Sequence, residues 1–265
     1  MPQFAANLSW LFQELPFLER FAAAKAAGFS AVEYLFPYAW DKQQLAHLHR
    51  THGLQLVLHN LPPGDYDAGE RGMACHPGRE AEFRASVALG IDYATALGCP
   101  QVHCMAGLLP DGVSRESAHR CLVANLQYAA AQCRTAGLRL LIEPINHFDI
   151  PGFFLNTVAQ AAAILDEVGA DNLLIQFDIY HAQRTQGELA ATIDKYLPRI
   201  GHMQLADNPG RHEPGTGEIH YAFLLRHIDA TGYRGWIGCE YKPLTTTLEG
   251  LGWLHADGAR PVPSH

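Results

Sequence analysis

The sequence predicts an α/β protein built as a single closed (β/α)8 barrel. Eight short apolar runs alternate with longer segments of helical periodicity along the chain. Alternating strands and helices imply parallel strands joined by right-handed crossovers, and eight such units favour a closed barrel over an open sheet. The length of 265 residues also fits one barrel of this type.

Each expected strand is a short run rich in aliphatic residues, which is typical of a strand buried on both faces. The eight runs are residues 4–8, 31–34, 55–59, 101–105, 139–143, 173–178, 200–206 and 236–240. Helical spacing of apolar residues lies between them, with examples at 17–24, 45–49, 121–136, 159–168 and 223–228. Four of these segments are followed by a glycine where a left-handed cap is expected: Gly28, Gly53, Gly137 and Gly232.

The turn after the first strand reads Asn7-Leu8-Ser9-Trp10 and lacks the GxGxxG pattern of a dinucleotide-binding sheet. No GxxxxGK[ST] motif occurs either, and no linker or low-complexity tract interrupts the chain. We therefore expect one catalytic barrel domain over residues 1–255. Residues 256–265, with Pro261 and Pro263, are expected to form a loosely attached tail.

The composition argues against several classes of protein. Hydrophobic residues make up 48% and charged residues 17%, which predicts a large core rather than disorder. The net charge of −8 and the lack of a dense Lys/Arg run disfavour a nucleic-acid partner. We expect neither a signal peptide nor a membrane partner, because no apolar run approaches about 18 residues. Six scattered cysteines without a CxxC pair indicate a reducing compartment, and we expect a cytoplasmic protein.

Polar side chains end most of the expected strands, and in a barrel these ends meet at one mouth where the chemistry occurs. They are Glu33, His59, His103, Glu143, Asp178, Gln204 and Glu240. Any one acid alone is as well explained by a salt bridge or a helix cap. Together they need a cation, because charge at buried strand ends is costly unless it is paired or metal-bound. Four oxygen ligands, from Glu143, Asp178, Gln204 and Glu240, suit Mg²⁺ or Mn²⁺ better than zinc.

Five further residues are candidates for binding a substrate. His181 follows the expected ligand Asp178 at the mouth, and His59 ends a strand. Arg211 and Arg71 lie in Gly-rich loops, Lys242 follows Glu240, and each of the three could bind a substrate carboxylate. Each of these residues has an alternative interpretation as an ordinary structural or solvated side chain.

The chain resembles the xylose-isomerase-like TIM barrels from residue 4 to residue 254, and within them the hydroxypyruvate isomerase group. The segments that carry the resemblance are LHNLP at 58–62, AGERG at 68–72, LIEPINHFDIPGF at 141–153, QFDIYH at 176–181, GHMQLADNP at 201–209 and GWIGCEYKP at 235–243. That family places a divalent metal on side chains at the ends of strands five to eight. Sugar epimerases and isomerases of this fold carry an HxH pattern in strand seven, whereas this chain reads His202-Met203-Gln204.

The resemblance implies a metal-binding isomerase of glyoxylate metabolism that interconverts hydroxypyruvate and 2-hydroxy-3-oxopropanoate. It also implies that Glu143 and Glu240 transfer a proton between C3 and C2. Several alternatives stay open: a 2-oxo-tetronate or a ketose as substrate, a hydride shift, either glutamate as the base, and either a monomer or a homo-oligomer. An abasic-site endonuclease and a non-catalytic binding barrel are the rival classes, and the net charge, Gln204 and the intact acids disfavour them.

Overall fold

Eight parallel strands pair in chain order, and β8 pairs with β1, so the sheet closes into a barrel. The computed structural model describes residues 2–256, so residues 257–265 of the predicted tail lie outside the described residues. The strands are β1 (Gln3–Asn7), β2 (Ala31–Tyr34), β3 (Gln55–Asn60), β4 (Gln101–His103), β5 (Arg139–Ile142), β6 (Leu173–Asp178), β7 (Ile200–Leu205) and β8 (Trp236–Cys239). The predicted (β/α)8 barrel is confirmed.

The strands carry apolar runs because both of their faces are buried, one against the barrel interior and one against helices. Every residue of β2 and of β7 is buried, for example. Two observed strands, β2 and β6, have the expected bounds, and the other six differ by one or two residues at an end, which is the usual uncertainty of a strand boundary. Glu143 and Glu240 consequently stand one residue beyond β5 and β8.

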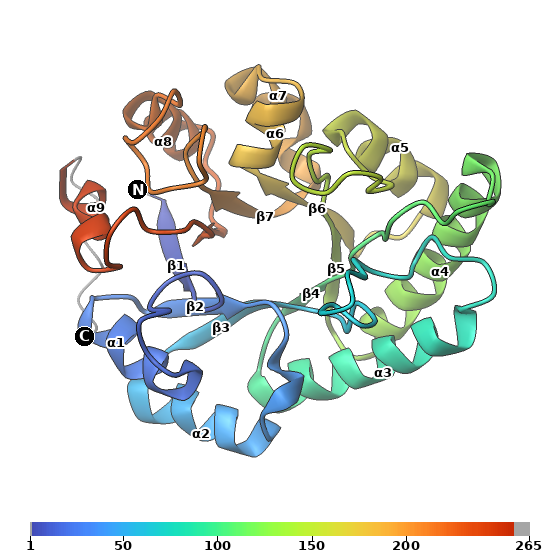
Figure 1. Ribbon diagram of the computed structural model, residues 1–265, viewed down its shortest axis with the longest axis horizontal. Helices are drawn as coiled ribbons and strands as arrows, with labels where there is room; N and C mark the ends of the chain where they lie inside the picture. The colour runs from blue at the N-terminus through green and yellow to red at the C-terminus, as the bar shows by residue number, and fades with distance from the viewer. Residues whose placement is uncertain (1, 257–265) are drawn as a thin grey trace.

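Helices surround the barrel in chain order, as the colour sequence in Figure 1 shows. They are α1 (Arg20–Ala26), α2 (Lys42–His52), α3 (Glu80–Leu97), α4 (Arg115–Thr135), α5 (Val158–Val168), α6 (Ile179–Thr185), α7 (Leu189–Tyr196), α8 (Tyr221–Ala230) and α9 (Trp253–Ala256). Short 3₁₀ turns occur at Phe17–Glu19, Pro37–Ala39, Leu197–Arg199 and Glu249–Leu251. The glycine predicted to end the second helical segment, Gly53, has φ +58° and caps α2 in the left-handed conformation.

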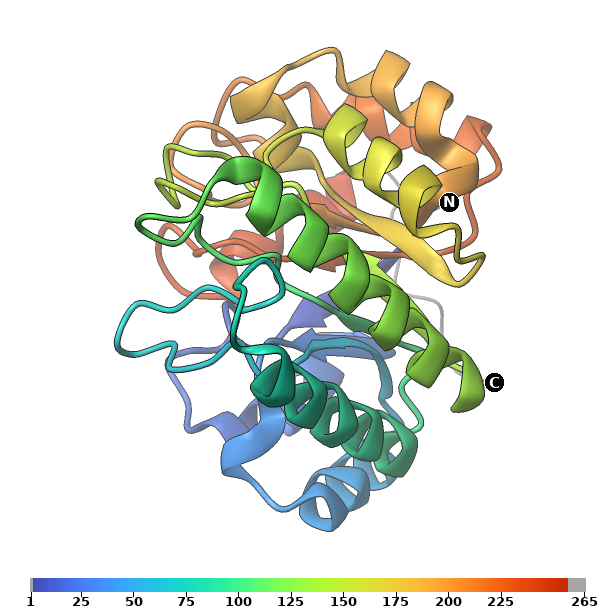
Figure 2. The same cartoon turned by 90° about the vertical axis from the view of Figure 1, so that its right-hand side faces the viewer.

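The loops that follow the strands gather at one end of the barrel, on the left of Figure 2. These loops include the long segment between β3 and α3 and the segment between β7 and α8. The acids predicted at the strand ends belong to this same end, where barrel enzymes place their chemistry. Among the described residues, no helix combines the length and the apolar character needed to cross a membrane.

Candidate active site

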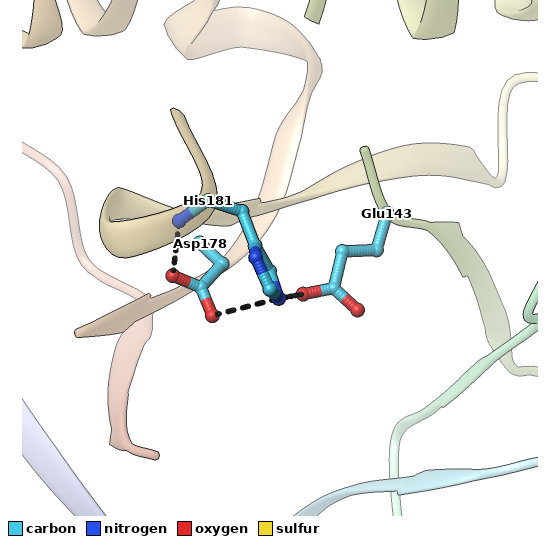
Figure 3. A group of neighbouring side chains, drawn as sticks. All are labelled: Glu143, Asp178 and His181. Atoms are coloured by element: carbon cyan, nitrogen blue, oxygen red, sulfur yellow. Dashed lines mark hydrogen bonds and ion pairs between the residues drawn. The ribbon is translucent and has the colours of Figure 1, made fainter. Parts of the chain in front are cut away.

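Three of the predicted site residues form a compact buried group at this mouth. Glu143 follows β5, Asp178 ends β6, and His181 lies in the first turn of α6. One potential ligand atom from each lies within 4.8 Å of the other two. Figure 3 shows the ring of His181 between the two carboxylates. The geometry therefore brings together an imidazole and two acids that the sequence placed on neighbouring strands.

Asp178 has two separate tasks for its two carboxylate oxygens. Its Oδ1 caps α6 by accepting hydrogen bonds from the backbone N–H groups of Tyr180, at 2.7 Å, and His181, at 3.2 Å. Its Oδ2 lies 3.8 Å from His181 Nε2. The cap fixes the carboxylate so that the second oxygen faces the site.

Glu143 is the least supported of the acids. Its Oε1 lies 3.9 Å from His181 Nε2, and its Oε2 lies 3.7 Å from His103 Nε2, so neither distance is a hydrogen bond. Glu143 Oε1 and Asp178 Oδ2 are both buried and accept no hydrogen bond from any residue between 2 and 256. A buried carboxylate oxygen without a partner is costly, which indicates that a ligand completes this site.

Glu240 is held by three donors. Its Oε2 accepts from the side-chain amides of Asn7, at 3.0 Å, and Gln204, at 2.6 Å. Its Oε1 pairs with the guanidinium of Arg211 at 2.5 Å. Glu240 therefore differs from Glu143 because all of its oxygens are engaged.

Gln204 presents its amide nitrogen, rather than its oxygen, to the acids. Its Nε2 donates to Glu240 and also to Glu33 at 2.7 Å, while its Oε1 accepts from Gln176 at 2.6 Å. His202 Nε2 lies 2.6 Å from the other oxygen of Glu33. In this arrangement Gln204 orients Glu240, and it would have to turn its amide over to offer the oxygen ligand expected from the sequence.

Arg211 enters the site from the loop after β7. Its Nη2 lies 2.5 Å from Glu240 Oε1 and 3.5 Å from Asp178 Oδ2, and the side chain is only 15% exposed. The guanidinium carbon lies 4.5 Å from the ring centre of Trp10 and 5.1 Å from that of Tyr180. Of the three predicted carboxylate-binding cations, this is the one that the structure brings to the acids.

The loop that carries Arg211 folds around a buried aspartate. Asp207 accepts hydrogen bonds from the backbone N–H groups of Asn208, Gly215, Gly217 and Ile219. The backbone N–H of Arg211 donates to the Asp207 carbonyl, and Arg211 itself has φ +58°. A non-glycine residue in this left-handed region carries strain, so the loop contacts must hold it there.

Burial and mutual repulsion shift the titration of the acids. Burial, together with the charges of Glu240 and Asp178, raises the pKa of Glu143 well above its usual range. Burial raises the pKa of Glu240 to about 8 although Arg211 opposes the shift. Burial likewise lowers the pKa of His181 well below its usual range, so the ring is neutral. Shifts of this kind from a cluster in a barrel mouth are typical of catalytic sites.

The other predicted substrate-binding residues are His59, Arg71 and Lys242. His59 is fully buried, and its Nδ1 lies 3.2 Å from the carbonyl oxygen of Asn60. Arg71 stacks on Tyr66 at 3.9 Å and donates to the carbonyl oxygens of Tyr66 and Glu70 within its own loop. Lys242 is exposed. The structure therefore does not bring these two cations to the carboxylates, and their substrate contacts stay a prediction.

The donor set fits a divalent cation. Glu143 and Asp178 each offer a buried oxygen that accepts no hydrogen bond, and hard cations such as Mg²⁺ and Mn²⁺ prefer oxygen ligands. Glu240 adds further negative charge beside them. A positive ion there would offset the repulsion that raises the pKa of these acids.

Sequence reasoning missed several residues that support the acids. Asn7 ends β1 and binds both Glu240 and Glu33, while Asn146 in the loop after β5 binds His181. Both residues stand at or just beyond a strand end, which is the signal that could have identified them. Asp149 was missed as well, and its carboxylate lies 3.8 Å from Arg211 Nη1.

Comparisons with known proteins identify the family of the chain. Residues 21–256 match the family described as xylose isomerase-like TIM barrel. Hydroxypyruvate isomerase of Escherichia coli (strain K12) is 54% identical over 254 residues, covering 96% of this chain and 98% of that protein. The 2-oxo-tetronate isomerase of Cupriavidus necator is 48% identical, with the same coverage.

Solved structures give the same fold. The crystal structure described as AP endonuclease, family 2 from Brucella melitensis has a TM-score of 0.94 and 44% identity, covering 96% of this chain and 98% of that one. L-ribulose 3-epimerase has a TM-score of 0.76 at 23% identity, over 95% of this chain and 85% of that one, and shows likeness of fold alone. On the sequence match over most of its length, this chain belongs to the xylose isomerase-like TIM barrel family and is an isomerase.

Proposed function

We propose that the chain interconverts hydroxypyruvate and 2-hydroxy-3-oxopropanoate with the help of a divalent cation, Mg²⁺ or else Mn²⁺. The observation that carries the proposal is the buried pair of acids, one unpartnered and one fully hydrogen-bonded, beside a neutral imidazole and an arginine. The 54% identity to a hydroxypyruvate isomerase supports this choice of substrate.

The reaction moves one proton from C3 to C2 and one proton from the C3 hydroxyl to the C2 oxygen. Glu143 is the better candidate for removing the C3 proton, because burial and the neighbouring acids raise its pKa and so make its carboxylate a stronger base. Burial raises the pKa of Glu240 to about 8, a range in which a carboxyl group can both take up and release a proton, so Glu240 is the candidate for the second proton transfer, at C2. In the reverse direction the two glutamates exchange these roles.

Arg211 and a bound cation can act on the oxygen atoms of the substrate. The guanidinium of Arg211, which lies near the rings of Trp10 and Tyr180, can bind the carboxylate or a negatively charged oxygen. A cation held by Glu143, Asp178 and Glu240 would supply positive charge for the oxygen atoms that become negative during the transfer. The side chain of Arg211 is only 15% exposed, and reduced contact with water strengthens each of these interactions.

The compartment and the pathway form part of the same proposal. All six cysteines are free and five of them are buried, which supports a reducing compartment, the cytoplasm. We propose a role in glyoxylate metabolism from the resemblance to hydroxypyruvate isomerases. No nucleic-acid partner is proposed, because the net charge of −8 disfavours contact with phosphates.

Incubation of the purified protein with hydroxypyruvate, with and without EDTA, tests the proposal. We expect NMR to detect 2-hydroxy-3-oxopropanoate, and we expect EDTA to abolish its formation until Mg²⁺ or Mn²⁺ is returned. In D2O, deuterium should appear at C2, whereas its absence at any exposure time favours a hydride shift. Turnover of a 2-oxo-tetronate without turnover of hydroxypyruvate would make the proposed substrate wrong, and cleavage of abasic-site DNA would favour a repair enzyme instead.

A further inference from the structure

Asn146 stands just behind the active site, in the loop between β5 and α5, and its side chain is fully buried. Its Oδ1 lies 3.0 Å from the backbone nitrogen of Phe148 and 2.9 Å from that of Asp149. A backbone N–H can only donate, so the atom facing these two groups must be the amide oxygen. The two contacts therefore fix which way round the amide of Asn146 lies.

The amide nitrogen of Asn146 then faces His181 and can only donate a hydrogen bond to it. Its Nδ2 lies 2.6 Å from His181 Nδ1, and an amide NH₂ group only donates. His181 Nδ1 must accept this hydrogen bond, so it carries the lone pair. In the neutral ring the proton therefore sits on Nε2, the nitrogen that lies between Glu143 Oε1 and Asp178 Oδ2, at 3.9 Å and 3.8 Å.

We propose that Asn146 is a positioning residue that holds His181 as the Nε2–H tautomer, so that the ring donates a hydrogen bond to a substrate oxygen instead of binding the cation. The tautomer of His181 does not depend on which substrate the protein binds. The contact with a substrate oxygen rests on the function proposed above. The distances of 3.8 Å and 3.9 Å are too long for hydrogen bonds to the acids, which leaves the Nε2–H group available to a ligand.

The alternative tautomer conflicts with the same contacts. A proton on Nδ1 would point at the NH₂ group of Asn146 and set two donors against each other. Turning the amide over would relieve that contact, but it would set the NH₂ group against the N–H groups of Phe148 and Asp149. Either arrangement leaves buried polar groups without partners, which is costly. Ligation of a cation through Nε2 needs one of these arrangements, so the cation is left to the carboxylates.

The exchange Asn146→Asp tests the inference with little change of shape. An aspartate keeps one oxygen for the two backbone donors but places a second oxygen, an acceptor, opposite His181 Nδ1. In ¹⁵N-detected NMR of histidine-labelled protein without metal or substrate, we expect wild-type His181 to be protonated at Nε2 and bare at Nδ1. In Asn146→Asp we expect Nδ1 to become protonated. The spectrum of His181→Gln identifies the signal among the fifteen histidines.

A control variant separates a specific change in the His181 tautomer from a general effect of adding a carboxylate to this loop. Asn156→Asp makes the same chemical change in the same loop, where Nδ2 donates to the Ile145 carbonyl, and it should leave the His181 signals unchanged. A proton on Nδ1 in the wild type would overturn the inference, and this result needs no variant that folds. A bare Nδ1 in Asn146→Asp would also overturn it.

Turnover gives a second and separate measurement. Loss of the Nε2–H donor should lower kcat/KM of Asn146→Asp by about 10²-fold, the effect of removing one donor to a developing oxyanion. Full activity in a variant whose tautomer has changed would overturn the role in catalysis. If the wild type has the Nε2–H tautomer but does not convert hydroxypyruvate, the proposed substrate fails and the tautomer assignment stands.

Discussion

Replacement of Arg211 by methionine should destabilise the metal-free protein strongly, because this side chain compensates the charge of the active-site acids. Its guanidinium lies 2.5 Å from Glu240 and 3.5 Å from Asp178. At an effective dielectric constant of about 20, unit charges at these distances attract by about 7 and about 5 kcal/mol, before the cost of desolvation. Loss of one partner from a buried pair destabilises a protein by about 3–5 kcal/mol. The loss of stability should stay within this range, below the full Coulomb energies, because the acids can take up protons once Arg211 is gone.

Thermal and urea unfolding in EDTA measure this effect. We expect a fall in the free energy of unfolding of about 3–5 kcal/mol, which corresponds to a fall in Tm on the order of 10 °C. Mg²⁺ or Mn²⁺ should restore more stability to Arg211→Met than it adds to the wild type, because the ion takes over the charge compensation. The rescue should grow with metal concentration.

Arg184→Met is the matched control. Arg184 pairs with Asp149 at 2.5 Å on the more exposed side of the same cluster, and its side chain is 28% exposed. An exposed pair of this kind contributes at most about 1 kcal/mol. If Arg211→Met costs no more than Arg184→Met in EDTA, or if metal stabilises the variant and the wild type equally, Arg211 does not compensate the charge of the acids.

Three other changes should have distinct effects. Glu143→Gln and Glu240→Gln should each lower kcat by about 10²–10⁴-fold in the hydroxypyruvate assay, because each removes an acid–base group. Gly238→Ala should cost about 1–3 kcal/mol in urea unfolding, and it should reduce activity, because a Cβ there would meet the carboxylate of Glu33 at 2.2 Å. Burial lowers the pKa of His49, so the stability it contributes is present above about pH 6.5 and is lost as the pH falls. The excess stability of wild type over His49→Gln should therefore shrink below that pH by up to about 1.4 kcal/mol per unit.

Each of these three predictions has a control or a contrary result. Glu167→Gln alters an exposed acid on α5 and should keep full activity. Normal turnover in both glutamine variants of the site would remove the pair from the mechanism. Gly252→Ala places a Cβ with its nearest neighbour at 3.9 Å and should be close to neutral, so an equal cost at Gly238 would contradict the clash. A stability difference for His49→Gln that stays constant with pH would contradict the burial argument.

The barrel could be predicted because each unit of the chain carries the same local signal. Buried strands need apolar runs, amphipathic helices need 3.6-residue periodicity, and the helix ends need glycine, so the eight strands were found in order. The helix α3, Glu80–Leu97, was not singled out. The strand ends shifted by one or two residues because the last hydrogen bonds of a strand depend on neighbours that are remote in sequence.

The site could be predicted only in part, for a physical reason. Residues at strand ends such as Glu143 and Asp178 meet because the barrel topology brings strand ends together. The position of a loop residue depends on contacts within the loop. Arg211 and Arg71 looked equivalent in sequence, yet the contacts around Asp207 direct Arg211 to the acids, and Tyr66 holds Arg71 away. The role of Asn146 depends on the direction of an amide, which no sequence pattern encodes.

These observations connect the conformation of one loop to the charge state of the site. Several acids buried together raise the pKa of one another, so the mouth destabilises the barrel unless a cation is present. The guanidinium of Arg211 supplies this positive charge only while its loop stays folded around Asp207, with Arg211 held at φ +58°. A metal ion that neutralises the acids, or a substrate carboxylate that binds Arg211, would weaken the attraction between the acids and Arg211 and so loosen its loop. Binding at the acids and ordering of the loop after β7 are therefore coupled, and each should alter the other.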